Sequence, residues 1–161
     1  MYDSEKWGVR TIIAAVVFLV MLIIAGIDSY TSYSEIDAVE YRAQVAADAS
    51  KMADRIDETL ANMQKRGVTR GNAALIFRNP VNDVALDYEA LQDLSNRAKQ
   101  IAQLHKNSVE YQTGLDDLRG TLREISIDAW YFTLIRNPLT WTSVVVLLVT
   151  IVFGWKWFEY A

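Results

Sequence analysis

The sequence predicts an all-α membrane protein: two transmembrane helices joined by a long extracytoplasmic helical hairpin or a small helical bundle. Two observations carry this prediction. Charge-free apolar stretches lie near both ends of the 161-residue chain, and apolar residues recur at helical spacing between them. The chain contains no cysteine, which excludes disulfides, thiolate metal ligands and a cysteine nucleophile.

The first apolar stretch, residues 11–27, contains no charged residue. With its flanks it reaches the roughly 20 residues that a helix needs to cross a hydrocarbon core of about 30 Å. A cleavable signal peptide is the alternative, but Ile23 and Ile24 stand where cleavage requires small residues. We therefore predict a transmembrane helix at 8–28, preceded by a short cytoplasmic N-terminus at 1–7.

The second apolar stretch, residues 139–155, is also free of charge. A buried core helix is the alternative interpretation. The aromatic residues that follow it, including Trp155 and Trp157, favour a membrane span that ends in a headgroup layer. The prediction is a second transmembrane helix at 138–158 and a cytoplasmic C-terminus at 159–161.

Basic residues near the spans predict the topology. Lys6 and Arg10 precede the charge-free stretch 11–27, whereas Arg42 is the first basic residue after it, and cytoplasmic flanks carry more Lys and Arg. The bases around the second span are balanced. We expect both termini in the cytoplasm and residues 29–137 in the periplasm, with the chain in a bacterial inner membrane.

Aromatic residues flank both predicted spans. Amphipathic rings prefer the headgroup level of a bilayer, so these residues are predicted membrane-interface anchors. They are Trp7, Tyr30, Tyr33, Trp130, Trp141, Trp155 and Trp157.

The first half of the middle region predicts one long helix. Apolar residues and alanines recur at steps of three or four from Ile36 to Met63, and no Gly or Pro occurs between 27 and 66. We expect an unbroken helix at about 30–66. Glycines at 67 and 71 end the pattern and predict a tip over 67–79.

The tripeptide Arg-Asn-Pro occurs twice, at 78–80 and at 136–138. Asn is a good N-cap, and Pro suits the first helical position because its missing N–H needs no partner there. Both copies are therefore predicted helix starts. The first would begin one or more helices over about 80–136, and the second would begin the membrane helix at Pro138.

The helix or helices at 80–136 carry a narrow apolar seam. From residue 101 onward the steps alternate between three and four, as in a coiled coil. Gly114 and Gly120 mark a bend, a close contact or a break. The unequal lengths of the two arms suggest a break near 106–107 or 114, or a short helix at the tip. The seam residues are Ile101, Leu104, Tyr111, Leu115, Leu118, Leu122 and Ile125.

The search for catalytic chemistry is mostly negative. His105 is the only histidine, and its place beside the seam favours a histidine at a helix interface over a general base or metal ligand. The adjacent carboxylates at 57–58 and 116–117 point about 100° apart on a helix, so they do not converge as an acid–base pair must. We predict no enzyme, no metal, no cofactor and no nucleic-acid partner.

One stretch, residues 59–82, contains no acid and combines basic with apolar side chains. Such a surface at the tip would dock an acidic partner protein or an anionic polymer. The alternative is a turn whose apolar residues only cap the bundle. The predicted docking residues are Lys65, Arg66, Arg70, Arg78, Leu75, Ile76 and Phe77.

Three functions fit these expectations. The first is a non-catalytic accessory or scaffolding subunit that packs through its helical seams on other membrane subunits, on itself as a homo-oligomer, or on both. The second is a sensory module, because the layout is similar to the four-helix-bundle input modules of chemoreceptors. With about three residues beyond the second span, such a sensor would signal through a partner protein. A small pore former is disfavoured by the non-polar spans and the large middle region.

Overall fold

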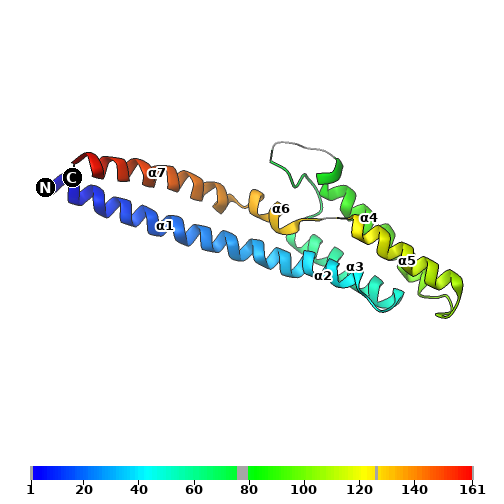
Figure 1. The fold of residues 1–161 in the computed structure, drawn as a ribbon. Coiled ribbons are helices and arrows are strands. Elements are labelled where there is room, and N and C mark those ends of the chain that lie inside the picture. Colours follow the sequence, from blue (N-terminus) through cyan, green and yellow to red (C-terminus); the bar gives the residue numbers. More distant parts are fainter. Residues whose placement is uncertain (1, 76–79, 126, 161) are drawn as a thin grey trace. The chain divides into compact units, whose positions relative to one another are not determined.

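The computed structural model describes residues 2–75, 80–125 and 127–160, and these are almost entirely helical (Figure 1). The chain divides into two compact units. The apolar unit comprises Met1–Ser29 and Leu134–Ala161, and the helical domain comprises Tyr30–Thr133. Each unit is described by itself.

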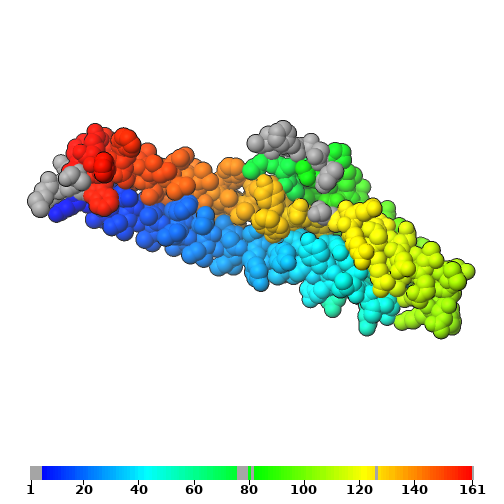
Figure 2. All heavy atoms as spheres, viewed as in Figure 1, coloured from blue at the N-terminus to red at the C-terminus, as the bar shows by residue number. Residues whose placement is uncertain are grey.

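The apolar unit consists of α1 (Tyr2–Ser32) and α7 (Pro138–Tyr160). Both helices are long and apolar enough to cross a membrane, as predicted. Only 6% of the most apolar 18-residue segment of each helix is buried. The two helices lie antiparallel and side by side (Figure 2), since Trp7 stacks near Phe153 while Asp28 accepts a hydrogen bond from Asn137. A Cβ atom added at Gly8 would lie 3.3 Å from the Trp157 ring, so a larger residue there requires a small shift of this ring.

The second Arg-Asn-Pro begins a helix as predicted. The Asn137 side-chain oxygen accepts a hydrogen bond from the Leu139 N–H at 2.9 Å, and Pro138 is the first residue of α7. In the first copy, Arg78 and Asn79 lie outside the described residues. Pro80–Asn82 forms one 3₁₀ turn, and the next α-helix begins only at Val84.

The helical domain contains a short π-helix and four complete α-helices, and ends in part of a fifth. In chain order they are η1 (Tyr33–Asp37), α2 (Ala38–Gln44), α3 (Ala49–Arg66), α4 (Val84–Ile101), α5 (Val109–Glu124) and α6 (Ala129–Arg136). Helix α3 packs against α2 and α4, and α4 packs against α5. Their apolar faces share one core, whose largest fully buried members are Ile36, Met52, Ile56, Met63, Leu91, Leu94, Leu118 and Leu122.

The unbroken helix predicted over 30–66 is wrong, because the chain reverses direction at residues 45–48. Asp48 is extended, and its carboxylate accepts a hydrogen bond from the Lys51 N–H at 2.9 Å, which starts α3 afresh. The returning helix brings Asn62 back to the Glu35 carbonyl at 2.7 Å. No glycine marks the reversal, and of its four residues only Ala46 is buried, whereas Val45 is 77% exposed.

This reversal also corrects the predicted tip. Residue 67 follows directly on Arg66, whose side chain bonds to Glu35 in η1, so the loop begins at the end of the domain where α1 enters. The opposite end consists of the turns at 45–48 and 102–108, which are joined by an ion pair of 3.1 Å between Asp48 and Lys106. Residues 67–75 are therefore not a distal tip, and 76–79 lie outside the described part.

The continuous seam predicted from Ile101 is interrupted by the turn at 102–108. Leu104 lies in this turn with 42% of its surface exposed, so it belongs to no helical seam. The break falls near Lys106, one of the two positions expected. The members on α5 are buried as a helix face requires, namely Tyr111, Leu115, Leu118 and Leu122, while Ile101 and Ile125 are partly buried against the core.

Candidate functional site

The predicted docking surface is partly neutralised by an acid from elsewhere in the chain. Glu35 of η1 forms ion pairs with Arg66 at 2.7 Å and with Lys65 at 3.3 Å. The hydrogen bond from Arg66 lowers the pKa of the Glu35 carboxyl, and burial opposes this effect. The stretch 59–82 contains no acidic residue, but the fold places the Glu35 carboxylate beside two of its basic residues.

Of the other predicted docking residues, the structure describes Leu75 and Arg70. Leu75 is about half exposed at 51%. Ile76, Phe77 and Arg78 lie outside the described residues.

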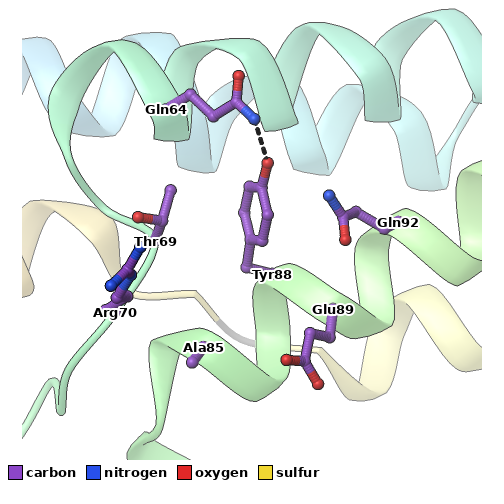
Figure 3. Close-up of a pocket in the computed structure, with 7 residues that line it drawn as sticks. All are labelled: Gln64, Thr69, Arg70, Ala85, Tyr88, Glu89 and Gln92. Atoms are coloured by element: carbon purple, nitrogen blue, oxygen red, sulfur yellow. Dashed lines mark hydrogen bonds between the residues drawn. The ribbon is translucent and has the colours of Figure 1, made fainter.

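Arg70 lines an open depression of about 420 Å³ between α3, the following loop and α4 (Figure 3). Gln64 donates a hydrogen bond to the Tyr88 hydroxyl across it. Arg70 and Glu89 lie on opposite sides of the depression, so its charged groups do not converge on one point.

The adjacent carboxylates singled out in the sequence all have basic partners. Asp57 pairs with Lys99 at 2.7 Å and Glu58 with Arg55 at 2.6 Å. Asp116 pairs with Arg119, and Asp117 with Arg97. These acids form surface ion pairs.

His105 lies exposed in the 102–108 turn, where its Nδ1 accepts a hydrogen bond from the Asn107 N–H at 3.3 Å. The expected position at a helix interface is wrong, because α4 ends at Ile101 and the histidine is no longer on a helix face.

Two carboxyls that were not predicted as a site are buried at the end of the domain next to α1. Asp37 in η1 is only 5% exposed, and Glu40 in α2 only 3%. The Asp37 oxygens accept hydrogen bonds from the backbone N–H groups of Ala129 at 2.9 Å and Trp130 at 3.2 Å. Asp37 thereby caps the start of α6, just after Asp128 with its left-handed φ of +46°.

The Glu40 carboxyl accepts fewer hydrogen bonds than that of Asp37. One of its oxygens, Oε1, accepts a hydrogen bond from Gln44 at 2.7 Å. Within the described part of the chain, its Oε2 accepts no hydrogen bond, and no ion pair reaches Asp37, Glu40 or Asp128. Oε2 is not sealed inside the protein either, since Thr140 Oγ1 is the one enclosed side-chain oxygen found without a partner among the described residues.

The electrostatics follow from this burial. Both carboxyls lie beyond the charge-free stretch 11–27, and the continuous helix from Glu5 to Gln44 is about twice as long as a membrane core is thick. Burial raises the pKa of Asp37 to about 6 and that of Glu40 to about 7, and neighbouring carboxylates such as Asp128 act in the same direction.

These carboxyls line a small cavity with a volume of about 30 Å³. Three partly exposed rings stand around it: Tyr33 is 40%, Tyr41 54% and Trp130 44% exposed. The lining residues are Tyr33, Asp37, Glu40, Tyr41, Ile127, Asp128 and Trp130. We call this the acid–aromatic cavity. Its carboxyl groups suit a proton or a cation.

The sequence did contain a signal for this cavity. Glu40 lies four residues after Ile36 and three before Ala43, so it falls on the apolar face of the helix. A charged residue on a buried face is unusual and points to a special role. Among the described residues, no group of three or more His, Cys, Asp or Glu side chains is arranged to hold a metal ion.

The predicted interface anchors are largely exposed, as rings in a headgroup layer would be. In the apolar unit Trp141 is 51% and Trp155 75% exposed, and the Trp141 N–H donates to the Ile135 carbonyl at 2.8 Å. The Arg10 guanidinium lies 4.8 Å from the Trp7 ring. In the helical domain, Tyr33 and Trp130 have an additional place as cavity walls.

Comparison of the chain with known protein families, with curated proteins and with solved structures finds no match.

Proposed function

We propose that the chain is a non-catalytic accessory subunit of a membrane protein assembly. Both apolar helices anchor it in the bilayer of a bacterial inner membrane, and the helical domain lies on the periplasmic side, where it packs on other subunits or on a second copy. The charges of the helical domain support a structural role, since Asp57, Asp116 and Asp117 each pair with a base.

The observation that carries this proposal is an apolar surface at the end of the domain opposite to the α1 entry. Val45 is 77%, Val109 76% and Leu104 42% exposed. Val45 and Leu104 lie in the two turns, and Val109 begins α5 directly after the second. The turns are held together, because the Ala49 N–H donates to the Tyr111 hydroxyl at 3.1 Å and Lys106 pairs with Asp48. Exposed apolar side chains gathered at one end of a domain favour a protein interface. We place partner docking at these turns, and not at 67–79.

Purification in mild detergent followed by native mass measurement tests the proposal. Wild-type protein is expected to retain additional subunits, or a second copy of itself. Val45→Asp and Val109→Asp should release them, because a charge at a buried apolar contact is costly. Leu86→Asp is the matched control, since Leu86 is 47% exposed on α4, away from both turns. A lone wild-type monomer, or loss of partners only in the Leu86 variant, contradicts the proposal.

A second candidate function is an extracytoplasmic ligand-binding module that signals through a partner protein. The acid–aromatic cavity favours it, because Asp37 both lines the cavity and caps α6. Helix α6 ends at Arg136, and the membrane helix α7 begins two residues later. Changes of charge in the cavity would therefore act directly on the helix that leads into the second span.

A further inference from the structure

We propose that the acid–aromatic cavity binds a primary ammonium group, with Glu40 as its open acceptor and Tyr33, Tyr41 and Trp130 as its walls. The inference goes beyond the subunit role and does not depend on it, because it rests only on the cavity within the helical domain. It assigns a class of ligand to the cavity, because helix packing alone does not explain why Glu40 is buried there among three aromatic rings.

The first argument is that two buried carboxyls lack a positively charged partner. Asp37 and Glu40 are at least 95% buried, and in the part of the chain that is described neither has a basic partner. A buried carboxylate without a counter-charge costs several kcal/mol, and folds normally pair it or replace it. Glu40 keeps Oε2 without a hydrogen bond in the wall of the cavity. A cation placed there supplies both the missing charge and the missing donor.

The second argument is size. A cavity needs roughly 10–15 Å³ to hold one water-sized group, so about 30 Å³ admits two or three such groups. An –NH₃⁺ group is of this size and carries three donors. A trimethylammonium or guanidinium group is several heavy atoms larger and exceeds the space.

The third argument is the chemistry of the walls. Cations are attracted to the faces of Trp and Tyr rings, and organic ammonium ions are recognised in this way. Three such rings stand around the cavity and remain 40–54% exposed, so they can also cover the alkyl carbon attached to the ammonium. Acidic residues alone would favour any cation, whereas the aromatic walls favour an organic one.

Two sources can supply this group. One is a free alkylamine in solution. The other is the ethanolamine headgroup of a phospholipid, because the cavity residue Tyr33 follows the charge-free stretch 11–27 by six residues.

The experiment measures the thermal unfolding of the full chain in detergent, with ethanolamine hydrochloride and choline chloride at equal concentrations. Ethanolamine at ten times its Kd is expected to raise Tm by about 3–6 °C, and choline should have no effect beyond that of salt. The shift should grow from pH 5 to pH 8, because ammonium binding requires ionised carboxyls. Glu40→Gln, which keeps the shape of the side chain, should abolish the shift, while the exposed control Glu58→Gln should keep it.

An equal shift with choline, or an unchanged shift in the folded Glu40→Gln protein, would overturn the proposal. Nanodiscs then separate the two sources. If phosphatidylethanolamine discs suppress the shift and phosphatidylcholine discs do not, the lipid headgroup occupies the cavity. If both discs leave the shift intact, the ligand is a free amine.

Discussion

Glu40 and Asp37 make the folded protein hold protons more tightly than the unfolded chain. Burial raises the pKa of Glu40 from 4.5 to about 7 and that of Asp37 from 3.8 to about 6. The contribution of these two groups to the free energy of unfolding is therefore largest while both carboxyls are protonated, below their unfolded pKa values. It falls as the pH rises through their folded values.

We expect the full chain in detergent to melt at a higher temperature at pH 5 than at pH 8. The raised pKa of Glu40 alone is worth about 2.5 kcal/mol between these limits. Circular dichroism melting curves at the two pH values measure the difference. Carboxyls with lowered pKa values, such as Asp48, act only at lower pH and do not reverse the trend.

Glu40→Gln serves as the control for this pH dependence. It removes the titrating group, so the variant should be more stable than wild type at pH 8 and should lose less stability between pH 5 and pH 8. A wild-type melting temperature that rises from pH 5 to pH 8 contradicts the assignment of buried, unpaired carboxyls.

The two basic residues that pair with Glu35 differ in burial, which predicts different energetic weights. The Arg66 side chain is 16% exposed and also donates to the Ser32 hydroxyl, whereas the Lys65 side chain is 67% exposed. Arg66→Ala should lower the free energy of unfolding by about 2 kcal/mol, because it leaves Glu35 partly buried without its main donor. Lys65→Ala should cost less than about 1 kcal/mol. Urea titration measures both, and equal losses would contradict the geometry.

At the scale of helices, the sequence predicted which segments are helical and where a helix begins better than it predicted where a helix is interrupted. The start of α7 at Pro138 follows from capping chemistry that is local to three residues. The reversal at 45–48 could not be predicted from periodicity. Ala46 and Ala49 are both buried, so the three-residue spacing continues through the turn as if the helix did. The only local signal was Asp48, an N-cap residue among alanines.

Two glycines on α5 offer a matched test of helix packing. A side chain at Gly114 would lie 2.8 Å from the Ile101 Cδ1, whereas nothing lies within 4 Å of one at Gly120. Gly120→Ala should raise the free energy of unfolding by up to about 1 kcal/mol through helix propensity. Gly114→Ala should gain clearly less or lose stability, because the end of Ile101 must move. Urea titration compares the two, and an equal gain would show that α4 and α5 do not approach as described.

At the scale of the whole molecule, segregated composition revealed the two apolar helices and the helical nature of the middle region. It did not reveal which segments pack together, because the apolar pattern of a helix face does not depend on which other helix packs against it. The basic loop was therefore placed at the wrong end, and Glu35 was not recognised as the partner of Arg66. The acid–aromatic cavity was missed for the same reason, since Asp37 and Trp130 are 93 residues apart in sequence.

The central claim is that both apolar helices cross the bilayer and leave the helical domain on the opposite side from the two termini. The chain has no cysteine, so single cysteines at exposed Glu5, Gln103 and Tyr160 can be labelled with a membrane-impermeant maleimide. In intact spheroplasts, position 103 should react at once, and positions 5 and 160 only after the membrane is opened. Reaction of positions 5 and 160 from different sides, or of position 103 only after opening, would contradict the account.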